Sequence, residues 1–307
     1  MGAFVVRRLL QAVVLIKCVL VFLFLLLHIT GDPVMVMAPE DATEEDIKQI
    51  TIQMGFDKPL YIQYYRFFSG VIKGDWGESY EHEEPAFGIV MERLPATIQL
   101  TAVAFSMSVL IGIPLGCFAA LKENQMTDRA CMIGAVFGQA LPNFWLGLMM
   151  ILFFSVTLKI LPSYGRGTPW HFIMPAFVAS SYQMARLARL MRSEMLEVLR
   201  QDYILTARSK GLNEKIVLVR HALKNSAIPI VTILGIDLGI MLGGTVIVET
   251  VFAWPGVGKL TIDAINTSDF PVVQVAVFVL ASVFILINTF VDILYTFLDP
   301  RLDFRKV

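Results

Sequence analysis

The stretch from residue 275 to residue 298 reads VAVFVLASVFILINTFVDILYTFL, and it decides the fold class. Its only charged residue is Asp292. A hydrocarbon core about 30 Å thick needs roughly 20 apolar residues of α-helix to cross it. A barrel strand would instead alternate polar and apolar residues over about 10 positions. A continuous apolar run of this length therefore predicts a transmembrane helix.

The composition extends this interpretation to the rest of the chain. Of the 307 residues, 56% are hydrophobic and 17% are charged, whereas soluble domains carry roughly 25% charged residues. We expect an all-α membrane protein with six transmembrane helices. The fourth is short, because Pro175 interrupts it and Arg186 follows it. The expected spans are residues 9–29, 97–121, 132–158, 170–185, 227–248 and 275–298.

The positions of the basic residues predict the orientation in the membrane, since Lys and Arg concentrate in short cytoplasmic segments. Arg7 and Arg8 precede the first span, whereas residues 30–96 are rich in Asp and Glu. With both termini cytoplasmic, six spans place every basic cluster inside the cell. The cluster between the fourth and fifth spans consists of Arg186, Arg189, Arg192, Arg200, Arg208, Lys210, Lys215, Arg220 and Lys224, and a further cluster after the sixth span consists of Arg301, Arg305 and Lys306.

The chain is expected to divide into an N-terminal anchor helix over residues 1–30, an extracytoplasmic region over residues 31–96 and a helical core over residues 97–307. The core would include a cytoplasmic loop over residues 186–226. In the extracytoplasmic region, residues 41–54 predict an amphipathic helix. Residues 61–72 carry aromatics suited to the membrane interface, although a solute-binding role is the alternative. These aromatics are Tyr61, Tyr64, Tyr65, Phe67 and Phe68.

Small residues four positions apart predict close packing between helices, because apolar burial alone cannot drive helix association in lipid. Gly112 with Gly116 and Gly134 with Gly138 show this spacing in the second and third spans. The fifth span repeats it in Gly235, Gly239 and Gly243. We expect these faces to contact protein.

The cytoplasmic loop predicts a compact protrusion suited to docking with another protein. From residue 185 to residue 200, apolar residues recur at helical spacing. The sequence DYILTARSKGL then spans residues 202–212, which predicts a short helix ended by Gly211. A second helical segment, residues 216–224, leads into the fifth span.

The loop resembles that of ABC-importer permeases, and in particular the branch that serves dipeptides, oligopeptides and nickel. Residues 205–207, Gly211 and residues 221–224 match the general permease pattern only in part, whereas TARSKGL at 206–212 and RHALK at 220–224 look much more like this branch. Further similar motifs span nearly the whole chain. They are GDP at 31–33, KGDWG at 73–77, LPAT at 94–97, PNFW at 142–145, ETVF at 249–252, PGVG at 255–258, Asp292 and DPR at 299–301.

The resemblance implies a type I ABC-importer permease of the B type, a multi-pass protein of a bacterial or archaeal plasma (inner) membrane. It further implies a second, homologous permease as partner, two ATPase subunits inside, and a solute-binding protein outside. Cofactors would be absent from this chain, since ATP and Mg²⁺ would be bound by the ATPase subunits, and no enzymatic activity is implied. The residues expected to dock into an ATPase are Tyr203, Leu205, Thr206, Ala207, Arg208, Lys210, Gly211 and Leu212.

The cargo is less well specified than the family. We expect di- or oligopeptides, with a nickel complex or glutathione as alternatives. A secondary transporter is the rival class. Such a protein would carry inverted repeats and coupling-ion carboxylates near the bilayer centre, and the sequence shows no inverted repeat and few acidic residues within its spans.

Two other kinds of site are disfavoured by residue spacing. The stretch AWPGVGKL at 253–260 resembles a phosphate-binding loop, but Ala253 replaces the first glycine and Leu260 replaces the Ser or Thr of that motif. No two of the four histidines have the i, i+4 spacing that places metal ligands on one helix face. We therefore expect neither a nucleotide site nor a metal site. The histidines are His28, His82, His171 and His221.

Lys17 lies near the middle of the first span, where a lone charge costs about 2.5–3.5 kcal/mol on insertion scales. We hypothesise that it forms an intramembrane polar pair with Asp237 or Asp292. The alternative is that the ammonium group faces a hydrated cavity.

Overall fold

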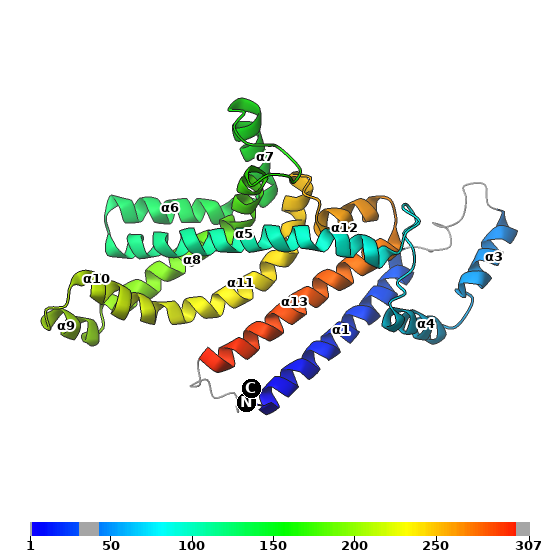
Figure 1. Ribbon diagram of the computed structural model, residues 1–307, viewed down its shortest axis with the longest axis horizontal. Coiled ribbons are helices and arrows are strands. Elements are labelled where there is room, and N and C mark those ends of the chain that lie inside the picture. Colours follow the sequence, from blue (N-terminus) through cyan, green and yellow to red (C-terminus); the bar gives the residue numbers. More distant parts are fainter. Residues whose placement is uncertain (1, 31–42, 299–307) are drawn as a thin grey trace. The chain divides into compact units, whose positions relative to one another are not determined.

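A computed structural model describes residues 2–30 and 43–298, and in these ranges the structure consists of helices, connecting turns and one isolated bridge between Glu78 and Pro85 (Figure 1). The GDP motif at 31–33 and the DPR motif at 299–301 lie outside the described residues. The chain divides into two compact units. Unit 1 comprises residues 1–96 and 255–307, and unit 2 comprises residues 97–254. Residues 255–307 thus belong to the same compact unit as the N-terminal region.

Unit 1 is built on two long antiparallel helices. Helices α1 (Gly2–Thr30) and α13 (Phe270–Leu298) pack along each other, which explains why the two ends of the chain fall in one unit. A core of small and β-branched side chains joins α12 to α13 and to the start of α5. The other helices of unit 1 are α3 (Glu44–Met54), α4 (Leu60–Lys73), the first part of α5 (Ala86–Leu121) and α12 (Val257–Asn266).

An aromatic cluster attaches α4 to the long helices of unit 1. The ring centroid of Phe24 lies 5.4 Å from that of Tyr64, and Trp76 lies 6.3 Å from Phe67 and 4.5 Å from Phe278. Such aromatic contacts add stability beyond the area that they bury. The opposite face of α4 is open, since Tyr61 is 73% exposed. The expected helix therefore forms, and its two faces differ as an interfacial helix requires.

Unit 2 is organised around α8 (Trp170–Leu199), which packs against both α6 (Met126–Ala140) and α11 (Lys224–Val251). The expected cytoplasmic helices follow α8. They are α9 (Asp202–Ser209), the short α10 (Glu214–Ile216) and a π-helix, η2 (Val217–Leu223), which continues into α11.

The third expected span, residues 132–158, is broken in the structure and does not form one continuous helix. Helix α6 ends at Ala140, and α7 (Asn143–Met150) starts after Pro142 and continues as the π-helix η1 (Ile151–Thr157). The two halves are bent by 106° relative to each other. Pro142 explains the break, because proline lacks an N–H donor and disfavours a helical conformation in the preceding residue.

Within the described residues, four helices are long and apolar enough to cross a membrane, and the bent pair of α6 and α7–η1 would make a fifth span. The apolar half of α8, residues 170–185, precedes a half that carries Arg186, Arg189 and Arg192. Helix α8 is therefore long enough but insufficiently apolar to meet the same criterion. An integral membrane protein is supported, and the count of six spans stays a prediction. The four helices cover Phe4–Leu26, Ala86–Leu121, Pro229–Val251 and Phe270–Leu294.

The glycine spacing correctly predicts the close packing of α5, and in part that of α6, where a β-carbon built on Gly138 would lie 3.6 Å from the β-carbon of Ala185 on α8. A β-carbon built on Gly116 would lie 2.4 Å from the carbonyl oxygen of Ala188 and 2.7 Å from the β-carbon of Met191. A β-carbon on Gly112 would lie 2.8 Å from the carbonyl oxygen of Met184. These glycines therefore let α5 approach the backbone of α8. In contrast, nothing lies within 4 Å of a β-carbon built on Gly134 or Gly243.

We expect Gly116→Ala to lower the midpoint of thermal unfolding in detergent, because the added methyl group would overlap the α8 backbone; overpacking costs about 1–3 kcal/mol. Gly134→Ala is the matched control. Its methyl group enters open space, so it should leave the midpoint unchanged or raise it, since alanine favours helix by about 1 kcal/mol. Equal midpoints for the two variants would contradict close packing at Gly116.

Candidate functional site

Helix α9 is a short element whose ends are set by its sequence. Asp202 lies in its first turn and Arg208 in its last turn, the placements that complement the helix dipole. Gly211 adopts φ = 75° just beyond it, a left-handed conformation that glycine adopts without steric cost. An eight-residue helix is marginal alone, so packing must hold it in place.

One face of α9 supplies that packing. Ile204 is fully buried and Ala207 is 6% exposed, and both belong to a cluster that includes Met191 and Met195 of α8. Ala207 was expected among the docking residues, and in the structure its methyl group helps to hold α9 against α8. Its contact with an ATPase stays a prediction. The remaining members of the buried cluster are Ala120, Leu187, Val217, Ala222 and Ile230.

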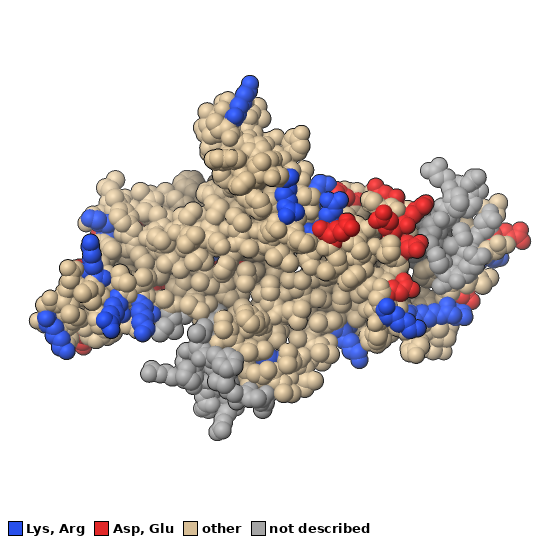
Figure 2. Space-filling model, viewed as in Figure 1, with Lys and Arg blue, Asp and Glu red and all other residues tan. Residues whose placement is uncertain are grey.

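The other face of α9 is open. Leu205 is 54% exposed and Tyr203 is 42% exposed, although an apolar side chain gains by leaving water. Leu212, beyond the turn, is 39% exposed. The other expected docking residues, Thr206, Arg208, Lys210 and Gly211, are exposed too. Figure 2 shows Lys and Arg side chains gathered over the end of unit 2 that α9 and α10 form.

Polar contacts fix the open face relative to its neighbours. The guanidinium of Arg208 donates two hydrogen bonds to the carboxylate of Glu214, at 2.6 and 3.2 Å. The side-chain amide of Asn225 donates to the Tyr203 hydroxyl at 3.2 Å and to the His221 carbonyl at 2.7 Å. Helix α9 is thus attached to both α10 and α11.

The Arg208–Glu214 pair also has a defined pH range. The hydrogen bond from Arg208 holds the pKa of Glu214 below its ordinary value. A lowered carboxyl pKa contributes stability that is present above the unfolded-state pKa and is lost as the pH falls through the folded-state pKa. The pair is therefore intact at neutral pH. Both side chains are exposed, so its contribution to stability is small.

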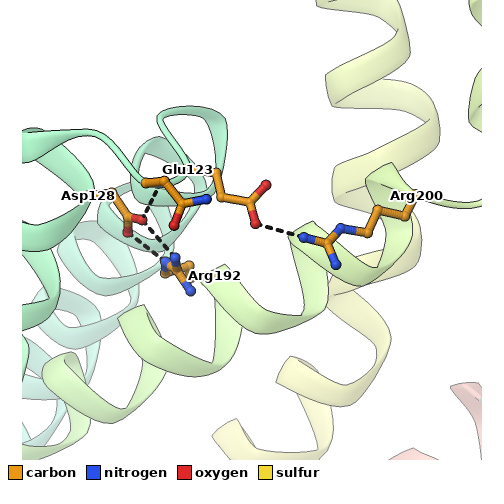
Figure 3. A network of polar contacts seen from close by, with 5 residues as sticks. Glu123, Asp128, Arg192 and Arg200 are labelled. Atoms are coloured by element: carbon orange, nitrogen blue, oxygen red, sulfur yellow. Dashed lines mark hydrogen bonds and ion pairs between the residues drawn. The ribbon is translucent and has the colours of Figure 1, made fainter.

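The arginines of α8 bind partners on neighbouring segments. Arg192 binds Asp128 of α6 through two hydrogen bonds, at 2.6 and 2.7 Å, and Arg200 binds Glu123 at 2.7 Å. In Figure 3, Arg192 of α8 and Arg200, which follows the last residue of α8, extend toward these carboxylates. The Asp128 side chain is only 4% exposed. Its other contact is the backbone N–H of Asn124, at 3.0 Å.

Two further arginines of α8 repeat this arrangement. The guanidinium of Arg186 lies 2.7 Å from the buried carboxylate of Asp237 on α11, and Arg189 donates to the side-chain oxygen of Gln139 on α6. The sequence had indicated these arginines only as markers of orientation. Their partners were missed because residues some 50–77 positions apart form the pairs, and no local spacing indicates them.

The pairing hypothesised for Lys17 stays a prediction, and the structure gives the surroundings of Lys17 and of its two hypothesised partners. Both carboxylates bind arginines, since Asp292 lies 3.2 Å from Arg8 and Asp237 binds Arg186. The ammonium of Lys17 lies 5.9 Å from the ring centroid of Phe68 instead. Helices α1 and α13 are antiparallel, and Lys17 lies about two and a half turns, or about 13 Å, beyond Arg8. Asp292 therefore meets the earlier cation.

Other expectations concern metal and nucleotide sites. Among residues 2–30 and 43–298, no group of three His, Cys, Asp or Glu side chains is placed to hold a metal ion. Lys259, which would be the lysine of a phosphate-binding loop, lies within α12, and its ammonium binds Asp263 one turn later.

Comparison with known proteins identifies the family to which this chain belongs. Residues 112–304 match the family described as binding-protein-dependent transport system inner membrane component, and residues 1–101 match the N-terminal family of the same systems. The chain belongs to this family. Its fold is also similar to a crystal structure of an amino acid ABC transporter with histidines, with a TM-score of 0.50, 17% identity and coverage of 70% of this chain and 94% of that chain.

Relatives of known name cover nearly the full length. The chain is 38% identical to the glutathione transport system permease GsiC of Salmonella paratyphi A, over 98% of this chain and 99% of the relative. It is 36% identical to a probable peptide ABC transporter permease of Sinorhizobium fredii and 35% identical to the dipeptide permease DppB of Alkalihalophilus pseudofirmus. Each of these two matches covers 99% of this chain and 100% of the relative.

The permease is therefore a B-type subunit of an ABC importer in the peptide and glutathione branch. It is a multi-pass protein of the inner membrane and is not itself an enzyme. Membership of a binding-protein-dependent system implies ATPase and binding-protein partners.

The ion pairs of α8 can be tested by a double-mutant cycle of Asp128→Asn and Arg192→Gln, with unfolding measured in detergent. We expect a coupling energy of about 1–3 kcal/mol, within the range for residues in one network, because Asp128 is buried. The cycle of Glu123→Gln and Arg200→Gln is the control. Those side chains are 36% and 70% exposed, and exposed pairs give about 0.2–1 kcal/mol. Additive effects at Asp128 and Arg192 would show that the buried pair is not coupled.

Proposed function

We propose that this chain is the B-type permease of an importer for short peptides, and that the exposed face of α9 is its docking surface for an ATPase subunit. The observation that carries the proposal is the two-sided burial of α9. Ile204 and Ala207 are held in the core, whereas Tyr203 and Leu205 are exposed beside basic side chains. A short helix that is fixed on one side and open on the other suits transmission of force from a partner.

The same geometry supports a mechanism. Because Ile204 of α9 shares a core with Met191 and Met195 of α8, a displacement of α9 must either move α8 or open that core. Helix α8 is in turn bound to α6 through Asp128 and to α11 through Asp237. ATP binding by the partner would favour one packing of these helices through differential contacts with α9. ATP and Mg²⁺ would remain on the ATPase, and this chain would supply no catalytic group.

The proposed arrangement in the membrane follows from the charges. Six spans with both termini inside would place α9 and its basic neighbours in the cytoplasm. A second, homologous permease would complete the translocation path. A binding protein would deliver cargo from the outside.

The cargo proposal rests on the named relatives, which are described as peptide, dipeptide and glutathione permeases. Glutathione is itself a tripeptide, so a short peptide is the chemistry that these names share. A nickel chelate is the alternative cargo, and a secondary transporter is the alternative class.

We expect Leu205→Ser to reduce ATP-driven uptake at least tenfold in vesicles that contain the assembled importer, with little change in the thermal stability of the subunit. The reason is that Leu205 contributes apolar area to docking and little to the core. Met126→Ser, which alters a 77% exposed side chain at the start of α6, should leave uptake unchanged. If the Leu205→Ser variant takes up cargo at the wild-type rate, the exposed face of α9 is not the docking surface.

The cargo can be identified by purifying the cognate binding protein under native conditions and analysing its ligand by mass spectrometry. We expect peptides of two to five residues. If the ligand found is instead a nickel complex, that complex replaces peptides as the proposed cargo. Uptake by this chain alone, driven by an ion gradient and independent of ATP, would support a secondary transporter instead.

A further inference from the structure

A charged pair lies deep in the membrane-spanning part of unit 2. The carboxylate of Asp237 on α11 lies 2.7 Å from the guanidinium of Arg186 on α8. The spanning part of α11 begins at Pro229, so Asp237 lies about 12 Å along the helix into a hydrocarbon core about 30 Å thick. Charged side chains at such a depth face the interior of a helix bundle and mark the pathways of substrates and ions.

Two buried oxygens at this pair lack a hydrogen-bond donor. Oδ1 of Asp237 binds Arg186, whereas Oδ2 accepts no hydrogen bond from the residues that the structure describes. The same holds for Oε1 of Gln183, which precedes Arg186 by one turn of α8. Gln183 is 7% exposed and Asp237 is 1% exposed. Because buried acceptors nearly always have a donor, these two oxygens fit a ligand that brings N–H groups.

The three side chains share one interface between helices. Residues three positions apart lie on the same side of a helix, so Gln183 occupies the face of α8 from which Arg186 reaches α11. Farther along α8, the carbonyl of Glu194 accepts a hydrogen bond from Ser226 of α11 at 3.4 Å. Later residues of α8 therefore meet earlier residues of α11, and this antiparallel register places Gln183 within about one turn of the level of Asp237.

One side of this polar cluster is open. The side chain of Arg186 is 33% exposed, whereas that of Asp237 is 2% exposed. Arg186 binds Asp237 through Nη1, and a guanidinium has five N–H donors in a plane. Its open side can therefore bind an anionic group while the rest of the cluster is closed.

The three groups complement the parts that all short peptides share. A carboxylate binds the terminal ammonium, a guanidinium binds the terminal carboxylate, and the amide oxygen of glutamine accepts from a main-chain N–H. Peptides of different sequence have only these groups in common. A site built from them would read the two ends and the main chain, and it would admit many side chains.

We propose that Gln183, Arg186 and Asp237 form a site in the translocation path that binds the charged ends of a short peptide. This inference rests on the proposed peptide cargo. Without cargo, Arg186 and Asp237 bind each other, which avoids two unpaired charges inside the membrane. The ends of an extended dipeptide lie about 7 Å apart, so the pair must separate to bind them. A movement of α8 relative to α11, driven through α9, would provide that separation.

The test measures the binding of trialanine, N-acetyl-trialanine and trialanine amide to the assembled permease and ATPase subunits in lipid nanodiscs, without the binding protein. We expect Asp237→Asn to weaken the binding of trialanine at least tenfold and to leave that of N-acetyl-trialanine at the wild-type value, because the acetylated peptide has no ammonium. Arg186→Gln should likewise weaken trialanine and leave trialanine amide unchanged. A purely structural role would weaken all three peptides equally.

Asp128→Asn is the matched control, because Asp128 is also a buried carboxylate paired with an arginine of α8, and both of its oxygens accept hydrogen bonds. It should bind all three peptides as the wild type does. The double variant of Arg186→Gln and Asp237→Asn guards against misfolding, since it leaves no unpaired charge, and it should bind the three peptides about equally. Gln183→Leu should weaken all three to the same extent, because each keeps its main-chain N–H groups.

Several results would overturn the proposal. If the wild type binds the three peptides equally, or binds none of them, this chain does not read the ends of a peptide. If Asp237→Asn and Arg186→Gln each weaken all three peptides by the same factor, the pair serves only the packing of α8 on α11. These failures would leave the proposed cargo standing as long as the cognate binding protein carries peptides, whereas a binding protein that carries none would contradict both proposals.

Discussion

A charged side chain in a membrane protein is costly to bury, and it is tolerated when an opposite charge or a hydrogen-bonding group meets it. Helix α8 carries arginines at positions 186, 189 and 192, and Arg200 follows its last residue; each binds a side chain outside α8. The buried partners, Asp128 and Asp237, come from α6 and α11. These pairs fix the register of α8 against both neighbours. The cluster that holds α9 is partly built on α8, so the position of α9 depends on the same register.

This arrangement explains why α9 can be both short and well placed. Its buried residues, Ile204 and Ala207, belong to the core of unit 2, and the Arg208–Glu214 pair and the Asn225–Tyr203 bond hold its exposed side. Apolar packing supplies most of the stability of such a helix, because surface ion pairs contribute little. The charged residues around it are therefore available for electrostatic complementarity with a partner, which influences specificity and association rate more than affinity.

Much of the fold could be predicted from the sequence where the signal is local. Apolar runs predicted the long helices, and Gly211 predicted the end of α9, since both depend on neighbouring residues alone. Pro142 carried the signal for the break in the third span, but the apolar composition on both sides of it favoured one helix. The pairings between charged side chains on different helices could not be predicted. Whether Asp292 meets Arg8 or Lys17 depends on how α1 and α13 are offset, and the sequence of either helix alone does not contain that offset. The burial of Ala207 likewise depends on which face α9 turns toward α8.

The offset between α1 and α13 also shapes a groove of about 610 Å³ that these two helices line in unit 1. Once Asp292 lies opposite Arg8, the antiparallel geometry places Phe284 near the level of Leu15, so the charged and apolar linings of the two helices coincide in depth. A different offset would put an arginine beside apolar residues of α13 and divide the groove into unrelated parts. A single ion pair therefore aligns two apolar helices and also produces a site with one charged end and one apolar end.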